Sequence, residues 1–361
     1  MREEFELGKS VGVALQTGYH RAFSAIFDSN ITTLLTGVIL FVLGTGPIRG
    51  YAITLSSGIL LSLFTALVLT RLVFNATVSP ERTKPFHMLK FLKNAHFDFV
   101  RWGNVASYTS FACTFAMMAI FLFRAFTHPV HVMSVDFTGG ASMTYSYAKK
   151  ADIGEVRRLV GTVVNDAALQ YESSPDGTGN LLLIKTGTVK IGDQNTSKLL
   201  ESALAKGVPD CKFKLAGEEN VGSEVGSDLK RSAVWSILAT LVGILIYVGV
   251  RFEFGFALGG VIALAHDAFF TLGLYSLFGR QVSLTIVAAL LTIIGYSISD
   301  TIVVFDRIRE DIRKYPEMDF KALCNLAINT TLSRTILTST TVLIATLSLF
   351  VFGGGAINDF A

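Results

Sequence analysis

The sequence of 361 residues has little charge, few cysteines and few of the motifs that mark soluble enzymes. Charged residues make up 16% of the chain, whereas they make up about 25% of an average soluble domain. Cys113, Cys211 and Cys324 are too few and too scattered to indicate a disulfide framework or a zinc site. The net charge of +3 is too small to indicate a polyanionic partner. These deficits exclude an ordinary soluble enzyme, a disordered chain and a nucleic-acid binder.

Sequence motifs for common cofactors and metals are missing as well. The sequence contains no Gly-x-x-x-x-Gly-Lys loop, no His-Glu-x-x-His and no paired Cys-x-x-Cys. We therefore expect no ATP hydrolysis, no cofactor and no metal in this protein.

Hydrophobic residues, in contrast, make up 51% of the sequence and gather in long runs. A helix of about 20 apolar residues spans the hydrocarbon core of a bilayer. Seven segments fit this length, and the first is the most polar at its start. They are residues 29–46, 50–73, 104–124, 232–250, 254–278, 284–305 and 331–352. The pattern predicts a polytopic α-helical membrane protein with about seven transmembrane helices.

The distribution of Lys and Arg predicts how these helices are oriented. With the N-terminus in the cytoplasm, the inside segments carry fourteen Lys and Arg residues, whereas the short outside segments carry only Arg49 and Arg280. The long stretch 125–231 is then extracytoplasmic. We expect a cytoplasmic segment at 1–28, two helices at 29–74, a cytoplasmic basic linker at 75–103, a helix at 104–124, an extracytoplasmic domain at 125–231, four helices at 232–352 and an outer segment at 353–361.

The extracytoplasmic stretch predicts a small α/β domain between about residues 130 and 220. Its pattern is strand, helix, strand, strand, helix, strand. We place strands near 131–147, 168–172, 180–186 and 211–216, and helices near 152–166 and 193–206. This βαββαβ order predicts a ferredoxin-like domain. The domain carries no catalytic cluster, which favours a binding or packing module.

Two segments of the chain resemble each other when the sequence is shifted by 309 positions. Residues 19–52 align with residues 328–361, and ten of the 34 ungapped positions are identical. Both segments contain Gly-x-Gly-x-Ile, which begins at Gly44 and at Gly353. Because internal repeats are common in transporter folds, we interpret the match as a duplicated helical unit.

The repeat predicts that the protein extends beyond both ends of this sequence. Since a membrane helix follows Ile48, its counterpart should begin at Ile357 and continue past the last residue. Residues 2–4 resemble residues 309–311, which follow a membrane helix, so a helix should also precede the first residue. We therefore expect a piece of a longer protein, truncated on both sides.

Asp300 is the strongest candidate for a functional side chain, because it lies inside the apolar run 284–305. An acid at the centre of a spanning helix costs roughly 2.5–3.5 kcal/mol on insertion scales, so by default it marks a pathway. A structural acid tied to neighbouring helices, or one near the inner interface, is the alternative. Tyr296 and Ser297 lie one turn back on the same face, where they could hydrogen-bond the carboxylate.

Arg334 lies one turn inside the last helix, within a stripe of small and polar residues. The stripe consists of Thr331, Arg334, Thr338, Thr341, Ala345 and Ser348. Arg334 either snorkels to the headgroups or pairs with Asp300, since each charge needs a partner in lipid. Protonation of the aspartate would break such a pair, which is what a proton-driven switch needs.

Asp267 and His266 lie near the middle of the helix at 254–278, where a functional and a structural role are equally open. Asp28 and Asn30 are most simply the N-cap of the helix at 29–46.

Two further segments have simple structural interpretations. Residues 136–140 indicate a tight Gly-Gly hairpin turn in the outer domain. Residues 306–311 indicate a solvated, positive-inside helix end.

Four motifs in order closely resemble the SecF family, membrane subunits of the bacterial Sec protein-export machinery in the resistance–nodulation–division superfamily. They are Asp136-Phe137-Thr138-Gly139-Gly140, His266-Asp267, Gly295 to Glu310 and Thr331 to Ser339. Residues 1–74 resemble the C-terminal end of SecD. The chain is thus similar to a fused SecD–SecF protein over nearly all of its length.

The resemblance implies an accessory subunit in the cytoplasmic (inner) membrane that uses the proton-motive force to help complete preprotein export. It implies that Asp300 is a proton-relay carboxylate and Arg334 its basic partner. Their positions in the sequence, and not the resemblance, make Asp267, His266, Tyr296, Ser297 and Thr338 candidate supporting polar residues. The implied partners are the SecYEG channel, the SecA pathway, the preprotein, the missing SecD portion, a YajC-like accessory subunit and membrane lipids, without nucleic acid.

The sequence departs from the family pattern in two respects. The SecD half normally supplies a further intramembrane aspartate and a large outer domain, and both are absent here. Ser299 stands where many relatives carry Asn, which we expect to be tolerated.

Two other functions stay open. One is a non-transporting translocon scaffold with a structural Asp–Arg pair. The other is a proton-coupled exporter of small molecules from the same superfamily, against which the small insert of about 90 residues argues.

Overall fold

The computed structural model describes residues 4, 8–77, 96–127, 129–164, 167–173, 180–191, 194–353 and 356–361. The chain divides into two compact units, each built from several stretches of sequence. The first unit consists of Met1–Phe111, Ile237–Asp267 and Leu291–Val342, and the second of Ala112–Ser236, Ala268–Leu290 and Leu343–Ala361.

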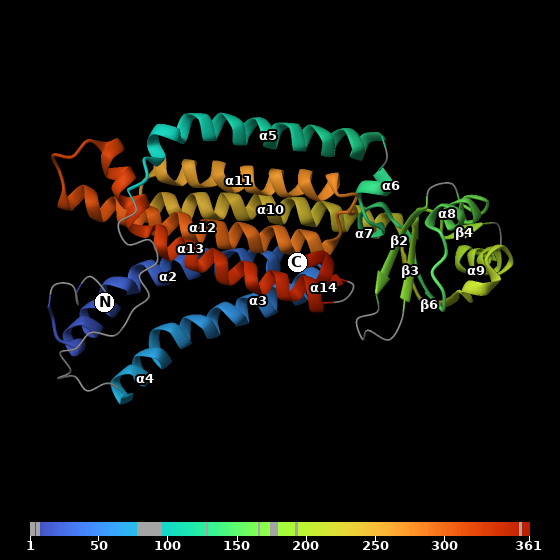
Figure 1. The fold of residues 1–361 in the computed structure, drawn as a ribbon, viewed down its shortest axis with the longest axis horizontal. Coiled ribbons are helices and arrows are strands. Elements are labelled where there is room, and N and C mark those ends of the chain that lie inside the picture. The colour runs from blue at the N-terminus through green and yellow to red at the C-terminus, as the bar shows by residue number, and fades with distance from the viewer. Residues whose placement is uncertain are drawn as a thin grey trace. The chain divides into compact units, whose positions relative to one another are not determined.

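Seven helices among the described residues are long and apolar enough to span a membrane, which confirms the number predicted (Figure 1). They are α2 (Val11–Leu43), a second span composed of α3 (Pro47–Phe64), the π-helical turn η1 (Thr65–Leu69) and α4 (Thr70–Thr77), then α5 (Phe99–Thr127), α10 (Ser223–Arg251), α11 (Phe254–Leu277), α12 (Leu284–Lys314) and α13 (Phe320–Phe352). Several of these helices continue past the apolar runs into flanking polar residues. α12, for example, extends to Lys314, whereas its apolar run ends at residue 305.

The first helix begins earlier than the sequence suggested. α2 starts at Val11, directly after Ser10, and not at the polar cluster that was expected to cap it. That cluster does not interrupt the helix, because its side chains bond to carbonyls of the preceding turn. Ser29 donates to the Ile26 carbonyl at 3.1 Å, and Asn30 donates to the same carbonyl at 2.7 Å. The N-cap interpretation of Asp28 and Asn30 is therefore wrong, and Asp28 lies in the interior of the helix.

Small residues let α2 pack closely against three other helices of the first unit. A Cβ atom added at Gly37 would lie 2.4 Å from Ser56 Oγ on α3, and one added at Gly295 on α12 would lie 2.7 Å from Thr33 Cγ2. A Cβ atom at Gly243 on α10 would lie 3.0 Å from Ile39 Cδ1. Close approach at small residues is how membrane helices gain packing energy. α2 is therefore a central packing element of this unit.

The second unit contains a four-stranded sheet with two helices on one face (Figure 1). Its elements are β1 (Gly140–Tyr147), α8 (Ile153–Gly161), β2 (Ala168–Ser173), β3 (Asn180–Thr186), the short β4 (Lys190–Ile191) and β5 (Gln194–Asn195), α9 (Thr196–Gly207), a 3-10 turn η2 (Pro209–Cys211) and β6 (Lys214–Val221). The strand order is β2-β3-β1-β6, and each neighbouring pair is antiparallel. The order of the longer helices and strands agrees with the predicted one, and β4 and β5 are short additions. The strand predicted over 131–147 begins only at Gly140, because the residues before it form short helical turns.

The core of this domain forms where α8 and α9 cover the sheet. Its buried side chains include Met143, Tyr145, Val156, Val160, Leu182, Ile184, Leu200 and Leu204. The Tyr145 hydroxyl is a polar group within this core, and it donates to the Ser197 carbonyl at 2.9 Å. Burial raises the pKa of Tyr145 well above its usual value, so the hydroxyl stays protonated as a donor.

Residues 136–140 do not form the hairpin turn that was expected. Val135–Thr138 make one helical turn, α7, which follows the short α6 (Pro129–Val132). Gly139 ends that turn with φ 74°, and β1 starts at Gly140 with φ 126°. A Cβ atom at Gly139 would lie 2.7 Å from Ser223 Cα at the start of α10. The two glycines therefore end a helical turn close to a neighbouring backbone. Glycine suits this position as it suits a hairpin turn, because it adopts positive φ angles without a steric penalty.

The same motif also contacts the beginning of α12 within the second unit. The Asp136 carboxylate accepts a hydrogen bond from the Leu284 amide at 3.1 Å. The Ser134 amide donates to the Val282 carbonyl at 2.9 Å, and the Val282 amide donates to the Val132 carbonyl at 2.7 Å. The motif therefore supplies a carboxylate to the helix N-terminus, where negative charge is favourable.

The helix boundaries agree with the predicted internal repeat. α2 and α13 both contain 33 residues, and their first and last residues differ by the same shift of 309 positions. The amides of Gly44 and Gly353 close the two helices on the carbonyls of Leu40 and Leu349, at 2.8 and 2.7 Å. The next helices, α3 and α14 (Ala356–Phe360), begin at equivalent positions. The two segments therefore share a turn as well as a sequence pattern.

Candidate functional site

The carboxylates of Asp28, Asp267 and Asp300 lie in the interior of membrane-spanning helices of the first unit, away from the charged end of α12 that carries Asp306, Glu310 and Asp311. They come from α2, α11 and α12 respectively. Because charge at membrane depth is costly, the partners of each carboxylate indicate whether it serves packing or chemistry.

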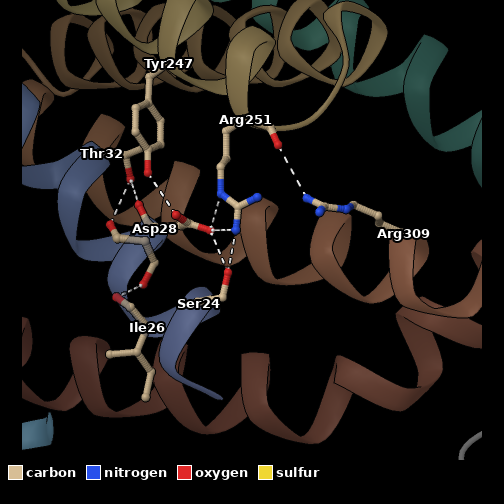
Figure 2. Close-up of polar contacts among 8 residues, drawn as sticks. Ser24, Ile26, Asp28, Thr32, Tyr247, Arg251 and Arg309 are labelled. Atoms are coloured by element: carbon tan, nitrogen blue, oxygen red, sulfur yellow. Dashed lines mark hydrogen bonds and ion pairs between the residues drawn. The ribbon is translucent and has the colours of Figure 1, made fainter. Parts of the chain in front are cut away.

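The Asp28 carboxylate is fully engaged with side chains of α10 and α2 (Figure 2). Arg251 Nε and Nη2 approach Asp28 Oδ2 at 2.9 and 2.8 Å, and the Tyr247 hydroxyl donates to Oδ1 at 3.0 Å. Ser24 Oγ adds a contact to Oδ2 at 3.2 Å and accepts from Arg251 Nη2 at 2.5 Å. Asp28 is only 4% exposed. This network therefore ties α2 to the end of α10.

Sequence reasoning missed this network of Asp28, Tyr247 and Arg251. Arg309 on α12 extends it by donating to the Arg251 carbonyl at 3.4 Å (Figure 2). The available signal was the four-residue spacing of Ser24, Asp28 and Thr32, which places polar groups on one face of a helix.

Asp300 has far fewer polar contacts than Asp28. It is half-buried, and Thr338 Oγ1 on α13 lies 3.3 Å from its Oδ1. The same hydroxyl also lies 2.9 and 3.1 Å from the Thr335 and Arg334 carbonyls of its own helix, so it shares one proton among three acceptors. Arg334 lies one turn before Thr338 on the same face of α13. Among the described residues, no ion pair joins Asp300 to Arg334. The structure therefore brings Asp300 together with Thr338, and the direct pairing with Arg334 stays a prediction.

Ser297 contacts Asp267 and not Asp300, contrary to the expectation from helical spacing. Its hydroxyl donates to Asp267 Oδ2 at 2.7 Å. Asp267 Oδ1 lies 3.1 Å from His266 Nδ1, and His266 Nε2 lies 2.8 Å from Ser110 Oγ on α5. These contacts form a polar chain across α5, α11 and α12.

The expected hydrogen bond from Tyr296 to Asp300 is also not among the described contacts, and its side chain is 56% exposed. Residues three and four positions apart share a face only approximately, because each residue turns a helix by about 100°. This turn directs Ser297 to α11 and Asp300 to α13.

Ser299 occupies the side of α12 that faces α2. Its hydroxyl donates to the Gly295 carbonyl at 2.8 Å and to the Ser29 carbonyl at 3.2 Å. Thr33 Oγ1 donates to the Gly295 carbonyl at 3.1 Å. Ser297, Ser299 and Asp300 therefore contact three different helices, α11, α2 and α13. A change in the charge of Asp300 would occur next to the contacts between α12 and these helices.

A cavity of about 1070 Å³ lies in the first unit beside this site. Thr338 and Arg334 line it, together with residues from α2, α10 and α12. Thr338 also contacts Asp300, so one side chain connects the wall of the cavity to the carboxylate. Among the described residues, no group of three or more His, Cys, Asp or Glu side chains is placed to hold a metal ion.

Seven membrane-compatible helices, interacting charges within them and a small α/β domain define a multi-pass membrane protein of transporter-like construction. The family model "Protein export membrane protein SecD/SecF, C-terminal" matches residues 201–361. Protein translocase subunit SecF of Calditerrivibrio nitroreducens is 41% identical over 249 residues, which cover 68% of this chain and 80% of that protein.

Protein translocase subunit SecDF of Brucella abortus is 34% identical over 368 residues, covering 100% of this chain and 47% of that protein. The crystal structure of SecDF from Thermus thermophilus matches with a TM-score of 0.83 and 33% identity, over 99% of this chain and 47% of that one. The chain thus spans about half the length of these SecDF relatives. It belongs to the SecD/SecF family of protein-export membrane proteins, which confirms the resemblance found in its sequence.

Proposed function

We propose that this chain forms part of a proton-driven accessory subunit of the Sec translocon, which assists preprotein export across the cytoplasmic membrane. The observation that carries the proposal is the setting of Asp300. Its carboxylate lies at membrane depth, and its hydrogen-bond partner among the described residues is a neutral hydroxyl, that of Thr338. A carboxylate held by a neutral donor changes protonation state without the loss of an ion pair.

In this proposal Asp300 is the proton-relay carboxylate, and Arg334 is the basic group that stabilises its ionised form. Proton binding weakens the attraction between Asp300 and Arg334, and proton release restores it. The contacts of α12 offer routes for the resulting movement, through Ser297 to Asp267 and His266, and through Ser299 to α2. Thr338 orients the carboxylate in this scheme, and Tyr296 is assigned only a supporting polar role.

We assign the topology predicted from the Lys and Arg distribution, with residues 125–231 on the extracytoplasmic side. We also assign the ferredoxin-like fold to the small domain. Its order β2-β3-β1-β6 with antiparallel neighbours supports this assignment, because a βαββαβ chain with two split βαβ units gives that order. The proposed partners are the SecYEG channel, the SecA pathway, the preprotein, a SecD portion and a YajC-like subunit.

A translocon scaffold without transport is the second candidate function. The Asp28 network supports it, because its charges are fully paired between α2 and α10, as a purely structural pair would be. In a scaffold the Asp300 carboxylate would be a second structural acid. Proton dependence of export separates the two functions.

The decisive experiment measures completion of preprotein export in inverted membrane vesicles that contain the complete SecD–SecF assembly, with and without a proton gradient. We expect Asp300→Asn and Arg334→Ala to assemble normally and to lose the gradient-dependent part of export. Glu310→Gln is the matched control, because Glu310 lies on the same helix but is exposed and paired with Arg307 at 3.1 Å. If Asp300→Asn and Arg334→Ala export like the wild type, the scaffold function replaces the proton-driven one.

A further inference from the structure

The cavity of about 1070 Å³ in the first unit is strongly cationic. Seven Lys or Arg side chains line it, against three carboxylates. The cations are Arg21, Arg251, Arg307, Arg309, Arg313, Lys314 and Arg334, and the anions are Glu4, Asp306 and Glu310. We infer that this cavity binds the phosphate group of an anionic phospholipid. The inference does not depend on the proposed proton relay.

The three carboxylates leave several of the cations without compensation. Glu4 pairs with Arg21 at 2.8 Å, and Glu310 pairs with Arg307 at 3.1 Å. Arg251 is bound to Asp28, as described above. In the part of the chain that the structure describes, the remaining cations form no ion pair with a carboxylate. They are Arg309, Arg313, Lys314 and Arg334. Asp306 is the lining acid left near these four cations, and Asp300 and Asp311 on the same helix balance part of the charge on Arg334 and Lys314.

The positions of the cations suit a single anionic group. Arg309 and Arg313 lie four residues apart on α12, so they share one face of that helix. Arg334 lies on α13 with Thr330 and Ser333, which also line the cavity. The Thr330 hydroxyl donates to the Leu326 carbonyl of its own helix at 2.8 Å. Guanidinium groups match phosphate oxygens with paired hydrogen bonds, and a serine hydroxyl adds a further donor. The cavity therefore offers the donors that a phosphate group requires.

The surroundings of the cavity favour a phosphate carried by a lipid over a free anion. Its walls come from membrane-spanning helices, and basic pockets between such helices bind anionic headgroups. Leu337, which lines the cavity one turn beyond Arg334, is 48% exposed. An apolar side chain beside a cationic pocket suits an acyl chain attached to the bound phosphate. Inorganic phosphate shares the headgroup chemistry, so the test must separate the two sources.

The test uses native mass spectrometry of the full chain purified in a neutral detergent. The protein is offered equal amounts of phosphatidylglycerol and phosphatidylcholine with identical acyl chains. We expect retention of phosphatidylglycerol to exceed that of phosphatidylcholine by about tenfold. The double variant Arg313→Gln/Lys314→Gln should abolish this preference, since each cation near a headgroup contributes on the order of a fivefold change in affinity.

The matched control is the double variant Arg101→Gln/Lys321→Gln, which removes the same charge from residues that do not line the cavity. It should retain the lipid preference of the wild type. Thr330→Glu is a second test variant, because it adds a negative charge to the cavity wall without removing a cation. It should weaken the preference as well, which keeps the inference testable if the double variant fails to fold.

Competition with millimolar inorganic phosphate separates the two sources of the anion. Retention of phosphatidylglycerol in its presence supports a lipid site. Displacement by phosphate, with the same dependence on Arg313 and Lys314, supports the phosphate site but assigns it to a soluble anion and overturns the lipid assignment. Equal retention of both lipids with no effect of phosphate overturns the inference, as does an equal loss of preference in the control variant.

Discussion

Asp28 and Asp300 both lie in membrane-spanning helices of the first unit, but their surroundings differ sharply. Asp28 is 4% exposed and has charged and neutral donors from Arg251, Tyr247 and Ser24. Asp300 is half-buried, and among the described residues its hydrogen bond comes from the Thr338 hydroxyl. The contrast shows that acids within the membrane-spanning helices of this unit differ in how fully their oxygens are satisfied.

The difference follows from the energy of burying a charge. A buried carboxylate is tolerated when an opposite charge and additional hydrogen bonds satisfy its oxygens. Asp28 meets this condition, because Arg251 supplies the opposite charge and Tyr247 and Ser24 add hydrogen bonds. Asp300 meets it only in part, which leaves its charge open to control by protonation or by movement of Arg334. We therefore expect substitution of Asp28 to lower the free energy of unfolding, and substitution of Asp300 to affect export with little change in stability.

Arg251→Ala should cause the largest loss of stability. It leaves the Asp28 carboxylate buried without its cation, and breaking a buried pair in this way typically costs about 3–5 kcal/mol. The measurement is the free energy of unfolding in mixed micelles. Arg313→Ala is the control, because the described part of the structure shows no ion pair for Arg313. Equal unfolding free energies for Arg251→Ala and the wild type would contradict a structural role for the network.

Tyr247→Phe should destabilise less, because it removes one donor from Asp28 and leaves Arg251 in place. A hydrogen bond to a charged group contributes about 1.5–3 kcal/mol. The same unfolding measurement applies, with Tyr296→Phe as the control for loss of a hydroxyl, since the Tyr296 side chain is 56% exposed. A loss as large in the control as in Tyr247→Phe would show that the effect is unrelated to Asp28.

The features that depend on local pattern were predictable from the sequence. Seven apolar runs gave seven spans, and the strand and helix alternation gave the small domain, because both depend on residues close together in the chain. The shift of 309 positions anticipated two helices of 33 residues each. Boundaries were less accurate, since polar turns such as residues 306–314 continue a helix without apolar periodicity.

The partners of the buried polar groups were not predictable in the same way. Asp28 meets Arg251 across more than 200 positions of sequence, and no local pattern encodes that distance. Ser297 shares a face with Asp300 only approximately. Its contact with Asp267 depends on the packing of α11 against α12, which the local sequence does not specify. Asp136 was assigned to a turn, because its contact with the α12 N-terminus depends on tertiary structure.

Thr338→Val should have a small effect on stability and a larger one on function. The substitution removes the hydroxyl that contacts Asp300, and a net hydrogen bond contributes only about 0.5–1.5 kcal/mol. Gradient-dependent export should fall, because the orientation of the carboxylate is lost. Thr341→Val is the control, since its hydroxyl bonds to a carbonyl of its own helix. Unchanged export in Thr338→Val would remove Thr338 from the proposed relay.

Asp300→Asn should change the free energy of unfolding least, by about 0.5 kcal/mol or less, because the amide keeps the shape of the side chain and can still accept from Thr338. Asp28→Asn should be clearly destabilising, since it leaves Arg251 without an anion in a buried setting. The difference between these two matched substitutions measures how much more of the fold depends on Asp28 than on Asp300. If Asp300→Asn destabilised the protein as much as Asp28→Asn, both acids would serve packing, and the loss of export in Asp300→Asn would no longer indicate a proton relay.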